Sequence, residues 1–315
     1  MKKNMVYGLI GISVKNGNYN ASFDKSPKQN SLGEIYASPQ SLGFAIKHQL
    51  EKDGYKILYK RSVGEEGVRN LKESFESKTG QELKNKITEN EVKSILFKEF
   101  MDIRQFGCTF ALSPNFGIMG ANQIGFGHNK YAETEEIISE LLAPFSADNN
   151  KKKEKSNEDD EKLKNNTLGE QVLVDEAHYF HSIVINPYEY EQYVGVIDGF
   201  EGYTQEDYKA FKDASMIAVS NYNSKSKTGC QNSFALYIET KDDIKNKINL
   251  NALDRYVKVY KEEKIIYDIG DLSAIVNDLK ESIKSVELYY NPYIVELKHN
   301  IEDVKLFNII TKKEL

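Results

Sequence analysis

The residues best suited to chemistry lie in the stretch 100–129, FMDIRQFGCTFALSPNFGIMGANQIGFGHN. The residue pattern predicts that Arg104 lies in a first strand and that Asn122 and Gln123 lie in a second, glycine-rich strand. A guanidinium fork and two amides beside exposed backbone suit a surface that binds a polyanion. The alternative is a β-hairpin that carries ordinary polar side chains on its surface.

The role of Arg104 depends on which residues share its side of the predicted strand. Asp102 and Phe106 each lie two residues away, so a regular strand would place all three on one face. Arg104 would then either pair with Asp102 on the sheet surface or bind a phosphate or base. We expect the second role, in which Arg104→Ala keeps the fold and weakens binding.

Catalysis has fewer candidates. His178 and His181 are three residues apart, a spacing that could hold a metal on a helix but points to opposite sides on a strand. Asp24 lies in a lysine-bearing loop, and Cys108 lies in an apolar stretch typical of a core thiol. The chain has no Walker motif and no nucleophile elbow. We therefore expect no enzyme activity, no cofactor and no metal.

Predicted strands and helices alternate along the chain. The main predicted strands cover residues 5–14, 55–62, 172–185 and 233–239. The predicted helices begin at Ser38 and at the capping box Thr204-x-x-Asp207, or cover 65–100, 131–142 and 271–284. A second capping box, Thr88-x-x-Glu91, begins a helix within 65–100. This order indicates an α/β (α+β) protein with a modified ferredoxin-like or RNA-recognition-motif (RRM) fold and long insertions.

Charge and composition narrow the class of protein. The net charge is −6, yet the first 61 residues hold ten Lys/Arg against four Asp/Glu. A basic groove on an acidic body fits this asymmetry, and scattered solvated lysines are the alternative. Two cysteines and no apolar run of membrane length favour a cytoplasmic protein without a membrane partner.

One stretch is too polar to fold on its own. Residues 148–164 hold six basic and six acidic residues and almost no large apolar side chain. We therefore expect a single domain over 1–315, with an inserted helical segment at about 65–100 and a flexible loop at about 145–170.

Four motifs carry a resemblance to a known family. They are Asp102-Ile103-Arg104-x-Phe106-Gly107, Gly120-x-Asn122-Gln123-Ile124-x-Phe126-Gly127, Gly202-Tyr203-Thr204-Gln205-Glu206-Asp207 and Asn223-Ser224-Lys225-Ser226-Lys227-Thr228-Gly229. Together they resemble the DevR-type (subtype I-B) backbone subunit of the type I CRISPR Cascade complex, in the RAMP superfamily. The resemblance covers roughly residues 5–240. Ala121 replaces a frequent proline and His128-Asn129 a frequent Arg-Ser, while 241–315 match no motif.

The resemblance implies a subunit that binds CRISPR guide RNA without reading its sequence, for antiviral defence against target DNA. The implied partners are the guide RNA, target DNA through the guide, further copies of the chain and other Cascade subunits. Those subunits are the 5′-handle-capping subunit, the large subunit and the repeat-cleaving endonuclease. The family carries an inserted thumb, which we expect to include residues 144–172.

Twelve residues are the expected RNA contacts. They are Lys15, Asn18, Asn20, Lys25, Lys28, Lys47, Arg104, Asn122, Gln123, His128, Lys225 and Lys227. Two other functions stay open at this stage. One is a metal- or aspartate-dependent ribonuclease that uses Asp24 or the two histidines, and the other is a general single-stranded RNA-binding module.

Overall fold

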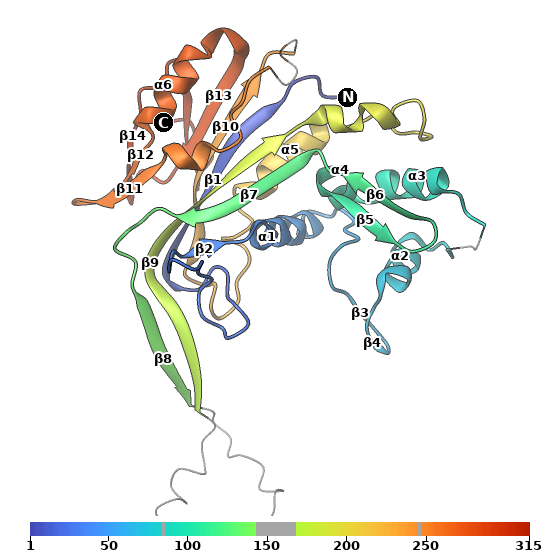
Figure 1. Ribbon diagram of the computed structural model, residues 1–315, viewed down its shortest axis with the longest axis horizontal. Coiled ribbons are helices and arrows are strands. Elements are labelled where there is room, and N and C mark those ends of the chain that lie inside the picture. The colour runs from blue at the N-terminus through green and yellow to red at the C-terminus, as the bar shows by residue number, and fades with distance from the viewer. Residues whose placement is uncertain (84–85, 143–167, 243, 245–246) are drawn as a thin grey trace, which may run out of the picture.

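The centre of the molecule is a mixed β-sheet (Figure 1). The computed structural model describes residues 1–83, 86–142, 168–242, 244 and 247–315. The four central strands are β1 (Val6–Gly17), β7 (Asn122–Asn129), β9 (Leu168–Ile185) and β10 (Cys230–Thr240). They lie in the order β10-β1-β9-β7, and each pairs with its neighbour in antiparallel fashion.

Two helices connect these strands in the predicted manner. Helix α1 (Pro39–Lys52) follows β1, and α5 (Gln205–Ser215) follows β9. The sequence β1-α1-β7-β9-α5-β10 is the β-α-β-β-α-β order of a ferredoxin-like fold, so the predicted fold class is confirmed. Helix α5 begins with the expected capping box, in which the Thr204 side chain accepts from the Asp207 N–H.

The predicted strand at 55–62 is wrong, because β7 takes its place in the sheet. The segment has an irregular backbone. The N–H groups of Leu58 and Tyr59 bind the Asp102 carboxylate at 2.9 and 2.8 Å instead of a neighbouring strand. The consecutive residues Ile57 and Leu58 are both buried in the helical side of the core, which does not fit the alternation of a strand.

The predicted helix at 131–142 is also wrong. Residues Glu136–Leu142 form β8, which pairs with the first part of β9 to make a long two-stranded arm (Figure 1). The β-branched pair Ile137 and Ile138 fits a strand better than a helix, and pairing with β9 decides the matter. Most of the predicted loop at 145–170 and of the predicted thumb at 144–172 lies outside the described residues.

Helical insertions and small hairpins lie between α1 and β7, where a helical segment was expected. The helices are α2 (Leu71–Thr79), α3 (Glu89–Glu99) and α4 (Met101–Phe106). The strands are β3 (Val63–Gly64), β4 (Gly67–Val68), β5 (Gly107–Ala111) and β6 (Asn115–Met119). The capping box Thr88–Glu91 opens α3 as predicted. Strands β5 and β6 form a hairpin that is shorter than expected, because Arg104 lies on α4, and Asn122 and Gln123 lie on β7 of the central sheet.

The C-terminal part widens the sheet and covers one of its faces. Its elements are 3-10 helices at Leu253–Tyr256 and Lys280–Ser282, α6 (Gly270–Asp278), and strands β11 (Lys258–Lys261), β12 (Ile265–Asp268), β13 (Ile283–Tyr290), β14 (Val295–Lys298) and β15 (Lys305–Asn308). Outside it, β2 (Tyr36–Ala37) pairs with β7, and a 3-10 helix at Pro187–Tyr193 follows β9. Helix α6 is shorter than the predicted 271–284, because β13 begins at Ile283.

Both faces of the sheet are therefore buried. One face packs against α1, α5 and the helical insertion, with Ile10 and Ile12 of β1 in that core. On the other face Tyr7 and Leu9 of β1 lie in one cluster with Tyr267 of β12. An RRM binds RNA on such a sheet face. Here the C-terminal elements occupy that face, so it is not open to a ligand.

Among the described residues, no helix is both long enough and apolar enough to pass through a bilayer.

Candidate RNA interface

Two lysine-bearing loops meet at the C-terminal end of β1. The Lys15 N–H donates to the Gly229 carbonyl at 2.9 Å, and the Asn18 N–H donates to the Ser226 carbonyl at 2.7 Å. A Cβ at Gly229 would lie 1.9 Å from the Lys15 carbonyl oxygen, so only glycine permits this approach. Residues 15–37 and 221–229, which we call the two-loop surface, together hold five lysines and two carboxylates.

The lysines of the two-loop surface differ in what their ammonium groups can reach. Lys25 and Lys225 are exposed, and Lys28 is half-buried; none of the three has an ion pair among the residues that the structure describes. Lys15 lies 3.3 Å from the Glu176 carboxylate. Lys227 donates to the Tyr19 carbonyl, and burial lowers its pKa. Lys227 thus holds the two loops together, while the ammonium groups of Lys25, Lys28 and Lys225 are left for a polyanion to bind.

The two expected asparagines shape the loop rather than project from it. The Asn18 side chain is buried, and its Nδ2 donates to the carbonyls of Lys25 and Val172 at 3.2 and 3.3 Å. The Asn20 Oδ1 accepts from the Ser38 N–H at 2.8 Å, at the start of α1. Both amides therefore fix the positions of the lysines around them.

A second group of expected contacts lies at a groove between α1 and β7. The groove has a volume of about 390 Å³ and is lined by Phe44, Lys47, Tyr59 and Phe106, among others. The Lys47 ammonium lies 5.4 and 5.8 Å from the ring centroids of Phe106 and Tyr59, and burial lowers its pKa. An ammonium among aromatic rings suits a base or phosphate that enters the groove.

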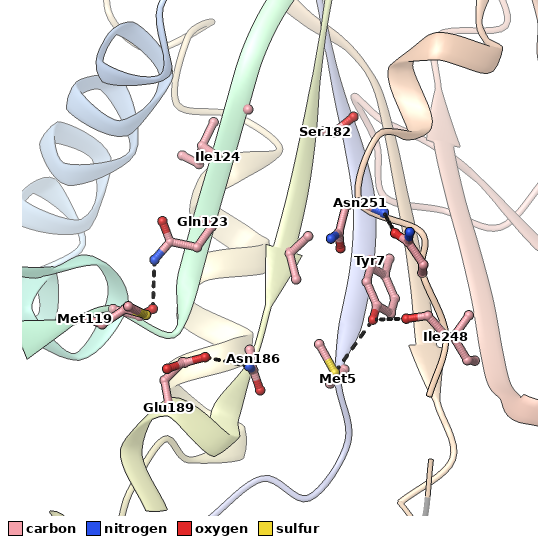
Figure 2. Close-up of a pocket in the computed structure, with 14 residues that line it drawn as sticks. Met5, Tyr7, Met119, Gln123, Ile124, Ser182, Asn186, Glu189, Ile248 and Asn251 are labelled. Carbon is pink, nitrogen blue, oxygen red and sulfur yellow. Dashed lines mark hydrogen bonds between the residues drawn. The ribbon is translucent and has the colours of Figure 1, made fainter. Parts of the chain in front are cut away.

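Gln123 stands between that groove and a second cavity. Its Nε2 donates to the Gly120 carbonyl at 3.0 Å, and the second cavity, of about 550 Å³, lies between β7, β9 and residues 248–251 (Figure 2). Asn122 is buried, and its Nδ2 donates to Gln105 Oε1 at 2.5 Å. His128 is exposed on β7 opposite Tyr36. Neighbouring Asn122 and Gln123 thus have different surroundings, one in the core and one at the surface.

Arg104 is not part of the two-loop surface. The strand predicted for it is wrong. It is on the six-residue helix α4, so it does not share a strand face with Asp102. Its Nε donates to Asp207 Oδ1 at 2.8 Å and its Nη1 to the Phe97 carbonyl at 2.7 Å. The guanidinium therefore joins the end of α3 to the start of α5, and the exposed pair with Asp102, which was the alternative to RNA binding, does not form.

Few features of the sequence indicate helix α4. Phe100 ends α3 and directly precedes α4, and no side chain caps the new helix. Gly107, with a φ of 67°, is the residue that permits the change of direction.

The candidate catalytic residues do not assemble. His178 and His181 point to opposite faces of β9, where Nδ1 of each makes a different contact, with the Tyr267 hydroxyl at 2.7 Å and with the Gly125 carbonyl at 2.9 Å. The described part of the chain contains no cluster of three His, Cys, Asp or Glu suited to a metal. Asp24 is exposed, and its Oδ1 accepts from the Ser26 N–H and hydroxyl at 3.1 and 2.7 Å.

His181 gives a testable pH dependence. Burial lowers its pKa from 6.5 to about 4, so the unfolded chain takes up the proton first as the pH falls. Stability should therefore be fully present above pH 6.5 and be lost as the pH falls toward 4. Between about pH 7 and about pH 4.5 the free energy of unfolding should fall by about 2–3 kcal/mol more in the wild type than in His181→Gln. Urea denaturation at both pH values checks this, and equal losses would contradict it.

An exposed aromatic group was missed in the sequence. Phe44 and His48, one helical turn apart on α1, stack with parallel rings at 6.4 Å between centroids. Tyr222 of the second loop meets them edge-on at 5.4 and 5.2 Å. The four-residue spacing of Phe44 and His48 on the polar side of α1 is the feature that would have shown it.

Comparison with solved structures shows a shared fold. A chain in a structure described as "CRISPR RNA-guided surveillance complex, pre-nicking" has a TM-score of 0.55 and 11% identity, over 95% of this chain and 96% of that one. A chain in a "CRISPR RNA-guided surveillance complex" has a TM-score of 0.48 and 13% identity, over 91% and 88%. No curated protein matches the sequence.

The family assignment comes from the sequence profile. The profile of the family described as "CRISPR-associated protein Cas7" matches residues 4–279. This range includes the four central strands, both crossover helices and the two-loop surface, and it extends beyond the motifs to α6. The chain therefore belongs to the CRISPR-associated protein Cas7 family.

Proposed function

We propose that this chain is a backbone subunit of a type I CRISPR Cascade complex, of subtype I-B, and that several copies lie side by side along one guide RNA. The observation that carries the proposal is the Cas7 family match over residues 4–279. The guide would pair with target DNA. The handle-capping subunit, the large subunit and the repeat-cleaving endonuclease would be further partners, and the chain itself would cut nothing.

The chemistry of the two-loop surface suits a guide of any sequence. Lysine ammonium groups bind phosphates, which are the same in every guide, and they leave base edges available for pairing. Lys25, Lys28 and Lys225 supply such groups on loops fixed by backbone hydrogen bonds. The binding energy would then come from phosphates and be shared equally among guides.

The arm of β8 and β9 supports the same function. It projects well beyond the body of the protein (Figure 1), and it starts from the part of β9 that pairs with the end of β1. A projecting hairpin can separate stacked bases at intervals along a single strand. We propose that this arm is the thumb expected from the family resemblance.

A length series of RNA tests the proposal. Single-stranded RNAs of one, two and three times a chosen length are mixed with the protein, and the mass of each complex is measured by mass photometry. The number of bound copies should rise in step with RNA length. One bound copy at every length, or no binding, would contradict a backbone role.

Lys225→Ala tests the role of the two-loop surface. The loss of one phosphate contact should weaken binding to all RNA sequences alike and reduce the slope of log affinity against log salt by about 1. Fluorescence anisotropy over a series of salt concentrations measures both quantities. Lys305→Ala, which removes an exposed lysine from β15, is the matched control and should leave the slope unchanged. Equal slopes in all three proteins would exclude Lys225 as a contact.

A further inference from the structure

Phe23 is completely exposed at the tip of a turn in the two-loop surface, with a relative exposure of 109%. The turn is closed by backbone hydrogen bonds that do not involve the Phe23 side chain. The Ser22 N–H donates to the Ser26 carbonyl at 2.8 Å, the Lys25 N–H donates to the Ser22 carbonyl at 3.1 Å, and Ala21 bridges to Pro27. The Phe23 ring makes no aromatic contact within the described part of the chain. Phe23 therefore does nothing for the fold that the structure shows.

The turn holds Phe23 in a defined position. Asn18, which is buried, binds the Lys25 carbonyl and so ties the turn to the end of β1. The Asp24 carboxylate, the only acid of the turn, accepts two hydrogen bonds from Ser26. A phenylalanine has only two side-chain torsions, so a ligand that meets its ring restricts little further motion.

The surroundings of the ring indicate its ligand. Lys25 and Lys28 follow Phe23 within five residues, and Lys225 lies on the adjoining loop. An aromatic face beside several ammonium groups is the combination with which proteins bind single-stranded nucleic acid, since bases stack on the ring and phosphates meet the lysines. A protein partner would need an apolar surface rather than cations around the anchor.

We infer that Phe23 is a stacking platform for an unpaired nucleobase of the bound RNA. The inference rests on the proposed function and adds to it a non-electrostatic contact. Lysines hold the strand by its phosphates, and Phe23 fixes where along the strand one base lies. Because every base has an aromatic face, this contact also works for any guide sequence.

The test compares Phe23→Ala, Phe23→Leu and Phe23→Tyr with the wild type. The probe is a short single-stranded RNA that carries 2-aminopurine, whose fluorescence is quenched by stacking. Phe23→Ala and Phe23→Leu should weaken binding by about 5- to 150-fold and lose the quenching, whereas Phe23→Tyr should keep both. The salt slope should be the same in all four proteins, because no charge changes.

The other outcomes overturn the inference. If Phe23→Leu binds and quenches like the wild type, the contact is apolar and not a stacked base. If Phe23→Ala keeps its affinity for the short RNA but forms smaller complexes on long RNA, Phe23 contacts a second protein. If Leu32→Ala, which removes an exposed side chain from the next turn, weakens binding as much, the effect is not specific to the ring. Failure of the wild type to bind RNA would instead refute the proposed function.

Discussion

Replacing Asp102 with alanine should lower the free energy of unfolding by about 3–5 kcal/mol. The carboxylate is fully buried and accepts from the N–H groups of Leu58 and Tyr59 at 2.9 and 2.8 Å. Alanine would leave both donors buried without an acceptor and would fill less space. It would also remove the negative charge that favours the ammonium form of Lys47 nearby.

Asp102→Asn removes the negative charge while it keeps the size of the side chain, so it separates the effect of the charge from that of the lost volume. Asparagine keeps one oxygen that can accept from one of the two N–H groups, so its loss of stability should be smaller than that of alanine. Urea denaturation followed by circular dichroism measures both variants. A midpoint for Asp102→Ala equal to that of the wild type would show that residues 55–62 do not depend on this carboxylate.

Replacing Arg104 with alanine should lower the free energy of unfolding by about 2–4 kcal/mol. The guanidinium is one-fifth exposed and Asp207 only 5% exposed, so alanine would leave a buried carboxylate without its cation. The Phe97 carbonyl would lose its donor as well. This is the opposite of the effect expected from the sequence, where Arg104→Ala was to keep the fold and weaken RNA binding.

Two controls make the Arg104 experiment decisive. Arg104→Lys keeps the charge but cannot bind Asp207 and the Phe97 carbonyl with one planar fork, so we expect an intermediate loss. Arg61→Ala removes an exposed arginine and should change stability by less than about 0.5 kcal/mol. If Arg104→Ala melts like the wild type and binds RNA more weakly, Arg104 is an RNA contact after all.

Elements with local determinants were predictable. The capping boxes at Thr88 and Thr204 and the Ser38-Pro39 start gave three helices in the right places. Strand β9 followed from its alternation. The order of elements then indicated the fold class. The motifs indicated a Cascade backbone subunit of subtype I-B, and of this prediction the profile confirms the Cas7 family.

Elements decided by distant partners were not predictable. Residues 136–142 become a strand because β9 pairs with them, and that partner begins at Leu168. Residues 55–62 lose their strand because a carboxylate some forty positions away binds their N–H groups. The sequence alone contains the residues of each contact but not their proximity.

The candidate site also has features that were predictable from the sequence and features that were not. The clustering of Lys225 and Lys227 was visible, whereas the contact of their loop with the loop after β1 depends on Gly229 lying against Lys15. Asn122 and Gln123 could not be told apart, because a one-residue step along β7 moves a side chain from the core to the surface. Which polar residues face solvent is set by tertiary structure.

The most direct test of the account is the salt and sequence dependence of RNA binding. Fluorescence anisotropy with several unrelated single-stranded RNAs of equal length, over a range of salt concentrations, gives the affinity and its slope. We predict a steep, equal fall of affinity with salt for every sequence, because phosphates supply the contacts. A strong preference for one sequence with little dependence on salt would contradict the account.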